Sequence, residues 1–131
     1  MLEFTLSWTC GVGESGTGGH EFARAWSDVE ACLAKIEGGQ GSVTLEVCDR
    51  DVGPLVLQVL ADSDAYLLTL GVDDGVDYSV RSYSGDHESE EMVNILGNYW
   101  SRKLICNNFD VVRYAFREFL SSGDVSEEIL K

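Results

Sequence analysis

The stretch LVLQVLADSDAYLLTLGVDDGVDYSVRSY, residues 55–83, decides the fold. It contains three largely apolar runs, 55–61, 66–71 and 76–83, that are too short for typical helices and rich in Val, Leu and Tyr. The turns between them, Asp-Ser-Asp and Asp-Asp-Gly, use residues that favour chain reversal. The pattern therefore predicts three consecutive antiparallel strands, with the uniformly apolar first run at the centre of a sheet.

The second turn sets the register of the last two strands. A two-residue Asp-Gly turn would place the leucines of the preceding strand opposite polar side chains. A three-residue loop at 73–75, with its glycine left-handed, instead pairs Leu70 with Tyr78 and Leu68 with Val80. Because a shift of one residue moves every side chain to the other face, the apolar pattern favours the three-residue loop.

Shorter runs on both sides extend this meander. Residues 2–9 alternate between apolar and polar side chains, which predicts a half-buried strand. Residues 43–47 alternate in the same way. Residues 92–96 and 103–106 are predicted to be further strands, connected by a segment that contains residues 98–100.

An amphipathic helix is predicted at 27–37. Its apolar residues recur with helical spacing, and Ser27 and Glu30 have the spacing of a capping box. The glycine pair at 38–39 is predicted to end it.

A second helix is predicted at 110–122, from an apolar stripe on one side of the segment. Asn108 or Asp110 can cap its start, and Gly123 supplies its end. The apolar residues near the end of the tail, 125–131, are expected to dock back on the body of the protein.

Length and composition predict a single domain. The chain has 131 residues, of which 44% are hydrophobic, enough to form a core. Hairpin-joined strands with two helices predict an α+β fold over residues 1–131: an antiparallel meander sheet of about five to seven strands with two helices packed on one face.

The net charge of the chain indicates which kinds of partner it can bind. The net charge is −14, from 23 acidic against nine basic residues. So much negative charge disfavours nucleic acid and anionic membranes, and it favours fast association with a basic protein. Residues 49–91 carry eleven acids and two bases, a net charge of −9, whereas residues 92–131 are balanced. The acid therefore concentrates in the meander and the loop that follows it.

The start of the chain lacks the basic and long apolar segments of a secretory signal, and no stretch reaches the roughly 20 apolar residues of a membrane span. The four cysteines are widely separated and form no Cys-x-x-Cys pair. They are interpreted as reduced thiols of a cytoplasmic protein, and zinc binding is not indicated.

No motif predicts catalysis or a cofactor. Residues 11–16 match G-x-G-x-x-G, but the strand before them alternates and more glycine follows where a helix should begin. The whole glycine-rich stretch, 11–19, is interpreted as a loop. His20 and His87 lie among polar residues without a nucleophile at a recognised spacing. Calcium is not indicated, because the Asp-x-Asp pairs do not extend to a complete binding loop.

We therefore interpret the chain as a binding protein rather than an enzyme. The candidate contact residues are acids of the turns and loop, for a charged rim, and aromatic residues that serve either as anchors or as core. They are Asp73, Asp74, Asp77, Tyr83, Asp86, Glu88, Glu90, Glu91, Tyr99 and Trp100.

The C-terminal segment resembles a known family. The phrases NFDVV at 108–112 and FREFLSSG at 116–123 resemble the closing segment of the first-numbered immunity-protein family of bacterial polymorphic toxin systems. The layout of the meander at 43–83 is also similar. The resemblance implies a protein that neutralises a cognate toxin domain, often a nuclease, in the cytosol of the cell that makes it.

This implication agrees with the charge, because a nuclease that grips phosphates is basic and an acidic inhibitor complements it. Three alternatives stay open from the residues alone. The first is an acidic decoy that imitates nucleic acid against a host DNA-binding protein. The others are an enzyme that uses the glycine loop and a plain structural subunit.

Overall fold

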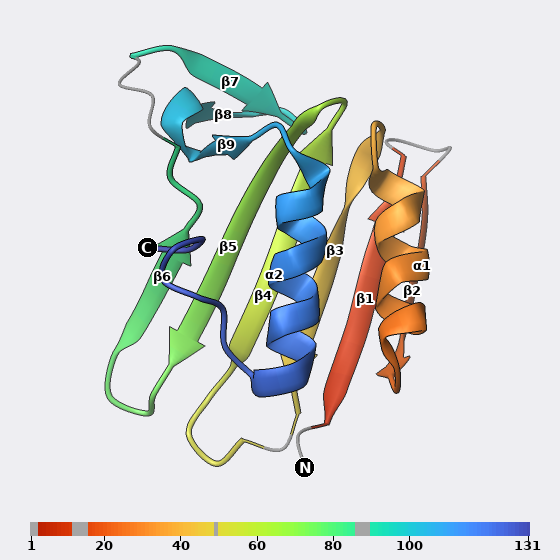
Figure 1. Ribbon diagram of the computed structural model, residues 1–131, viewed down its shortest axis with the longest axis vertical. Coiled ribbons are helices and arrows are strands. Elements are labelled where there is room, and N and C mark those ends of the chain that lie inside the picture. The colour runs from red at the N-terminus through yellow and green to blue at the C-terminus, as the bar shows by residue number, and fades with distance from the viewer. Residues whose placement is uncertain (1–2, 12–15, 49, 86–89) are drawn as a thin grey trace.

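The computed structural model describes residues 3–11, 16–48, 50–85 and 90–131. In this part of the chain, seven strands form an open antiparallel sheet, two more form a small second sheet, and two α-helices cover one face of the main sheet (Figure 1). The strands are β1 Phe4–Cys10, β2 Thr17–Ala23, β3 Gln40–Val47, β4 Leu55–Asp62, β5 Ala65–Asp73, β6 Tyr78–Ser82, β7 Met92–Ile95, β8 Asn98–Ser101 and β9 Ile105–Cys106, and the helices are α1 Trp26–Ile36 and α2 Phe109–Ser122.

The main sheet confirms the predicted α+β fold and the meander. Its order is β2-β1-β3-β4-β5-β6, with β9 pairing the start of β5. The strand predicted to be central, β4, has β3 and β5 as neighbours and contributes Leu57 and Val59 to the core. The turn between β4 and β5 is tight, and Ser63 adopts a positive φ of 58° there.

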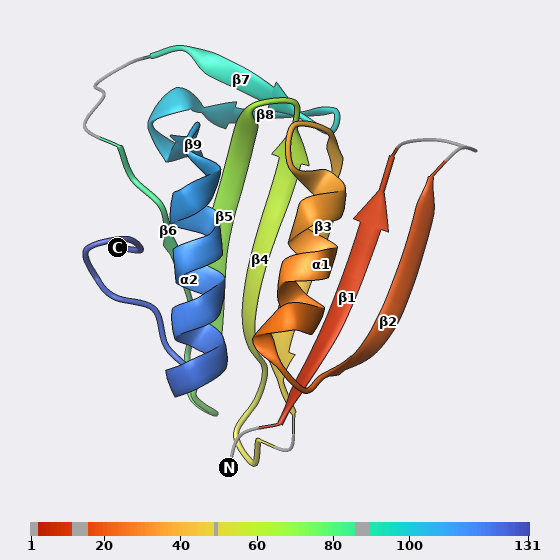
Figure 2. The same ribbon diagram turned by 45° about the vertical axis from the view of Figure 1, so that its right-hand side comes forward.

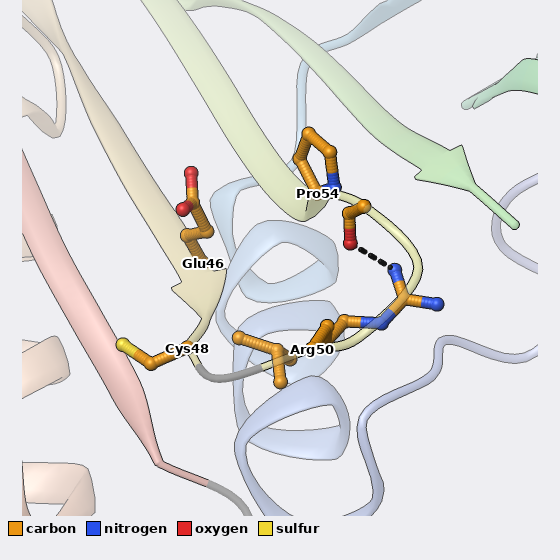
Figure 3. Close-up of a pocket in the computed structure, with 6 residues that line it drawn as sticks. Glu46, Cys48, Arg50 and Pro54 are labelled. Atoms are coloured by element: carbon orange, nitrogen blue, oxygen red, sulfur yellow. Dashed lines mark hydrogen bonds between the residues drawn. The ribbon is translucent and has the colours of Figure 1, made fainter. Parts of the chain in front are cut away.

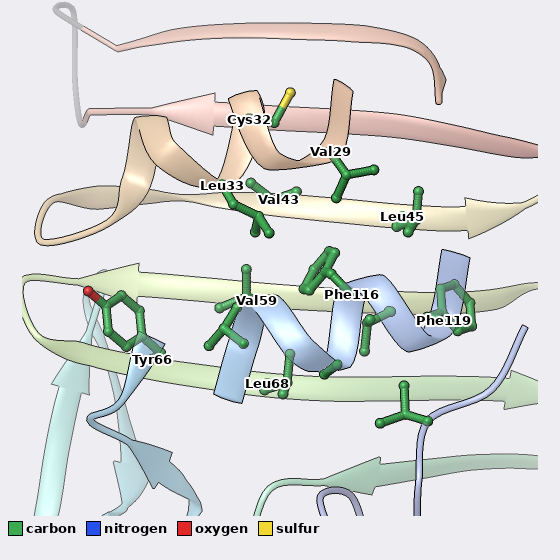
Figure 4. Packing of buried hydrophobic residues seen from close by; sticks show 14 of the residues in the cluster. Val29, Cys32, Leu33, Val43, Leu45, Val59, Tyr66, Leu68, Phe116 and Phe119 are labelled. Carbon is green, nitrogen blue, oxygen red and sulfur yellow. The ribbon is translucent and has the colours of Figure 1, made fainter. Parts of the chain in front are cut away.

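The core lies between the sheet and the two helices. Figure 4 shows Val29, Cys32 and Leu33 of α1 and Phe116 and Phe119 of α2 directed at the strands. All five are 2% exposed or less, and full burial of such an apolar side chain contributes roughly 1.5–3 kcal/mol. The aromatic edges also meet, since the Phe4 and Phe119 ring centroids lie 5.5 Å apart.

The predicted capping box of α1 is wrong. The helix begins at Trp26, one residue earlier than predicted, and the Asp28 carboxylate accepts hydrogen bonds from the backbone nitrogens of Arg24 and Ala25. Asp28 takes the role predicted for Glu30, because it is the third residue of the helix and its carboxylate reaches back to the N–H groups that precede the helix. The predicted end is confirmed, with Gly38 at a φ of +73°.

Helix α2 follows its prediction closely. The Asn108 side chain accepts from the Asp110 nitrogen at 3.0 Å, which decides between the two candidate caps. Gly123 has a φ of 78° and donates its N–H to Phe119 O at 2.7 Å, which ends the helix as predicted.

The glycine-rich stretch is not a loop throughout. Thr17, Gly18 and Gly19 begin β2, which pairs with β1 over seven residues and forms one edge of the sheet. The sequence pattern did not predict this strand, because its residues are mostly exposed and do not alternate between apolar and polar side chains. Gly19 is required there, since a Cβ would lie 2.7 Å from the Trp8 indole.

The predicted register between β5 and β6 is wrong. Leu70 lies opposite Arg81, and Asp73 lies opposite Tyr78, so the connecting turn spans four residues rather than three. The prediction assumed that the apolar residues of β6 face the core. In fact Tyr78 and Val80 are 66% and 52% exposed, because β6 is an edge strand and Arg81 occupies its helix-facing side.

The segment predicted as a connection at 98–100 is a strand. β7 and β8 form a hairpin whose turn, Leu96-Gly97, has positive φ at both residues, and the Leu96 nitrogen donates to the Asp62 carboxylate at 3.1 Å. This hairpin covers a second apolar cluster around Leu67. Leu67 alternates with the core residue Leu68, so the cluster lies on the sheet face away from the helices.

The predicted docking of the C-terminal tail is confirmed, and Arg81 holds it. The guanidinium donates to Val125 O at 2.7 Å and to Leu130 O at 2.9 Å, and it pairs with Asp124 at 2.9 Å. Leu130 is fully buried beside Tyr83, with which it forms a β-bridge.

Replacing Arg81 by Met is expected to lower the free energy of unfolding by about 1.5–3 kcal/mol, since two carbonyls lose a charged donor. Urea denaturation followed by circular dichroism measures the effect. Arg24→Met is the matched control, because Arg24 is an exposed residue just before α1, and it is expected to change stability by less than about 0.5 kcal/mol. Equal losses of stability in the two variants would show that the hydrogen bonds from Arg81 to the C-terminal tail do not stabilise the fold.

The four cysteines are not joined by disulfides. Burial raises the pKa of Cys32 and of Cys106, which keeps both thiols protonated. Neither of the two helices in the described ranges has the length and apolar content that a membrane crossing requires.

Candidate protein-interaction surface

The turn between β5 and β6 is an organised cluster of carboxylates. The Asp74 carboxylate accepts from the backbone nitrogens of Asp77 at 2.8 Å and Val76 at 2.9 Å. Asp73 accepts from the nitrogen of Gly75, whose φ is +89°. The hydrogen bonds from Asp77 and then Val76 lower the pKa of Asp74, so this group stays anionic.

The connection between β3 and β4 packs against this turn. The Asp73 nitrogen donates to Pro54 O at 2.9 Å, and the Val52 side chain lies over Gly75, where a Cβ would be 3.5 Å away. Arg50 braces the connection by donating to Gly53 O at 2.9 Å (Figure 3). The guanidinium also helps to lower the pKa of Asp74, although less than the backbone does.

Apolar side chains lie exposed between these carboxylates. Val76 is 88% exposed, Tyr78 66%, Val80 52% and Val52 49%. Tyr78 and Val80 point away from the helices because they lie opposite Asp73 and Gly71 rather than opposite the core residue Leu70. We call this surface the acidic end, made up of Asp51, Val52, Asp73, Asp74, Val76, Asp77, Tyr78 and Val80.

The carboxylates of the β5–β6 turn form no ion pair with a described residue, although Arg50 lies close enough to act on Asp74. The ion pairs between described residues involve Arg81, Arg102 and Arg113, and none includes Asp73, Asp74 or Asp77. An exposed apolar centre with a rim of free carboxylates has the composition of a protein–protein interface.

Four other predicted contact residues lie at the opposite end of the sheet, in or beside the β7–β8 hairpin (Figure 1): Glu90, Glu91, Tyr99 and Trp100. Glu90 and Tyr99 are exposed there, and Glu91 lies 3.8 Å from Arg102. Asp86 and Glu88 fall outside the described residues. The described candidates therefore form two groups rather than one continuous patch.

Two of the predicted aromatic anchors serve as core. Trp100 is half-buried and packs on the cluster that contains Leu67, and Tyr83 packs on the main core. Only Tyr99 of the three is largely exposed. Sequence reasoning missed the apolar part of the acidic end, because Tyr78 and Val80 were assigned to the core through the wrong register.

Other kinds of site find little support in the described residues. No group of three or more His, Cys, Asp or Glu side chains is placed to hold a metal ion in the ranges that the structure describes. His20 forms a hydrogen bond with the Ser7 hydroxyl at 2.7 Å, and His87 is outside the described ranges. A strand, β2, follows the G-x-G-x-x-G motif where a dinucleotide site needs a helix N-terminus.

The fold and this surface define a single-domain α+β protein with an acidic, partly apolar surface at one end of its sheet. The sequence matches a family of unknown function (DUF6911) over residues 7–129, and the chain belongs to that family. A comparison with curated proteins gave no significant match.

A hypothetical protein from Neisseria gonorrhoeae has a similar crystal structure. Its TM-score is 0.75 at 13% sequence identity, over 95% of this chain and 91% of that one. At that identity the likeness concerns the fold alone.

Proposed function

We propose that this protein is an immunity protein that binds and neutralises a cognate bacterial toxin domain in the cytoplasm, without catalysis. The observation that carries the proposal is the acidic end, where Asp73, Asp74 and Asp77 surround exposed apolar side chains and pair with no described cation. The resemblance of residues 108–123 to an immunity-protein family supports the same function.

The charge pattern indicates the chemistry of the partner. A toxin domain that cleaves nucleic acid carries Lys and Arg around its active site. The Asp73 and Asp74 carboxylates, which accept hydrogen bonds from backbone N–H groups, are pre-organised for such cations, because less rotamer freedom remains to be lost on binding. Long-range attraction accelerates the encounter, which suits an inhibitor that must act before its toxin does.

The apolar residues supply the affinity that surface charge cannot. Tyr78 offers an aromatic ring and a hydroxyl, the combination that hot spots favour. Val76 and Val80 extend the contact on either side of it along the chain. The acidic-decoy alternative requires acids spaced regularly over a surface, whereas the described candidates gather at two ends of the sheet.

The test is to express the C-terminal domain encoded immediately upstream of this gene, with and without this protein. We expect cells to die without it and to survive with it, and the two proteins to co-purify one to one. Tyr78→Ala is expected to weaken the complex by about 30-fold or more, as loss of a hot-spot residue does.

Tyr99→Ala is the matched control, because Tyr99 is exposed to a similar degree, 68%, at the opposite end of the sheet. It should bind and protect like the natural protein. A harmless upstream domain, or one that kills regardless, would refute the immunity function. Full affinity in Tyr78→Ala would remove the acidic end as the contact surface.

A further inference from the structure

The outer edge of β2 is uncovered. β2 pairs with β1 through all seven of its residues, and no other described strand lies along its outer side (Figure 2). Its backbone forms no hydrogen bond outside that ladder to any residue in the described ranges. The strand contains no Pro and no Lys, the residues that most often protect an exposed edge.

The opposite edge of the sheet, which β6 forms, contacts the C-terminal tail. At the end of β6, the Lys131 nitrogen donates to Ser82 O at 3.1 Å, and Leu130 forms a bridge with Tyr83. The C-terminal tail thus covers part of that edge. An unprotected edge of seven residues on one side only indicates that β2 pairs with another strand.

We propose that β2 pairs antiparallel with β2 of a second copy of this chain, with His20 opposite His20 on the two-fold axis. A two-fold axis perpendicular to the sheet requires one residue to face itself. Centring on Glu21 would oppose two carboxylates, and centring on Gly19 would shorten the overlap to residues 17–21. Only the His20 centre pairs the whole strand, Thr17–Ala23, without like charges face to face.

In this register, side chains of one copy lie opposite the glycines of β2 in the other copy. On the open face, Phe22 of each copy lies opposite Gly18 of the other. Phe22 is 58% exposed in the monomer, and Gly18 has no side chain to obstruct it. A cross-strand aromatic ring over glycine buries apolar surface and restores the packing that glycine lacks.

Charge is complementary on the face that carries the helices. There, Glu21 of one copy lies opposite Gly19 of the other. Gly19, Lys35 and the chain's own Glu21 line the same hollow, of about 410 Å³, in which the Lys35 ammonium lies 4.8 Å from the centre of the Trp8 ring. Lys35 makes no ion pair with a described residue of its own chain, so Glu21 of the second copy can pair with this cation at the hollow that the chain's own Glu21 also lines.

The position of β2 also limits repulsion between two chains of net charge −14. β2 and the acidic end lie at opposite sides of the sheet, separated by the width of β1, β3, β4 and β5. At strand spacings of about 4.7–4.9 Å this separation exceeds the Debye length of about 8 Å at physiological salt. Dimerisation therefore leaves both acidic ends free.

Sedimentation equilibrium on the full chain tests the dimer. We expect a mass of twice the 14.4 kDa of one chain, falling to the monomer on dilution. Phe22→Lys is expected to raise the dissociation constant of the dimer about tenfold or more. Val80→Lys makes a similar change on the other edge strand and should leave that constant unchanged. A monomer at every concentration, or equal effects of the two variants, would overturn the proposal.

Cross-linking tests the register. In a background with Cys10→Ser and Cys48→Ser, His20→Cys should form a disulfide dimer on mild oxidation, because residues directly opposite have Cα atoms about 4.5 or 5.5 Å apart. Glu21→Cys faces Gly19 and should stay monomeric in reducing-agent-free gels. Cross-linking through position 21 instead, or through neither position, would refute the proposed pairing.

Discussion

Replacing Phe116 by Ala is expected to lower the free energy of unfolding by about 3–5 kcal/mol. The Phe116 side chain is fully buried at the centre of α2, between the helix and the sheet (Figure 4). Its truncation removes the transfer free energy of the ring and leaves a cavity that well-packed neighbours fill only in part. Such a loss is a large part of the roughly 5–15 kcal/mol that stabilises a domain.

Urea denaturation of the natural chain and of Phe116→Ala measures this effect. Tyr114→Ala is the matched control, since Tyr114 is an aromatic residue of the same helix that is 59% exposed, and it should cost less than about 1 kcal/mol. Phe116→Leu should recover most of the loss, because it keeps most of the apolar volume. A loss below about 1 kcal/mol in Phe116→Ala would mean that α2 does not pack on the sheet as described.

Neutralising the carboxylates of the acidic end together is expected to slow association with the proposed toxin domain by about 10- to 1000-fold at low salt. The change is Asp73→Asn, Asp74→Asn and Asp77→Asn in one chain. Asparagine retains an oxygen that can accept the turn's hydrogen bonds, so the fold of 73–77 is preserved. Stopped-flow or surface-plasmon measurements across a salt series give the association rate and its salt dependence, both of which should fall.

A control with the same net charge separates local from overall electrostatics. Glu30→Gln, Glu127→Gln and Glu128→Gln remove three exposed carboxylates elsewhere on the molecule. This variant should keep most of the association rate. Equal slowing in both variants would show that total charge, not the acidic end, governs the encounter.

Much of the fold was predictable because the signals are local. The α2 stripe, its Asn108 cap and Gly123 act within a few residues of the chain, and all three function as predicted. The meander was equally readable, since apolar runs and aspartate turns alternate through 55–83. Those features depend on propensity and periodicity, which the sequence carries directly.

The missed elements depend on partners that are distant in the chain. β2 is a strand only because β1 pairs with it, as its own residues are glycine-rich and exposed. The turn at Leu96-Gly97 carries no strong hairpin signal, and the carboxylate of Asp62, far away in sequence, binds its backbone nitrogen. Tertiary contacts override weak local preference in both places.

The negative charge of the candidate site was predictable from the sequence, but its exposed apolar surface was not. The acids at 73, 74 and 77 followed from the sequence, but the exposure of Tyr78 and Val80 did not.

The amino-acid sequence by itself determined the α+β class, the two helices, the cap at the start of α2, the glycines that end both helices, and the concentration of acid in the meander. Only the tertiary structure decided the register of β5 and β6, and with it which face carries Tyr78 and Val80. The physical reason is Arg81, whose guanidinium binds the carbonyls of Val125 and Leu130 from the helix-facing side of β6. A charged side chain there is stable only because the C-terminal tail supplies its acceptors, and no pattern within residues 55–83 could reveal that contact.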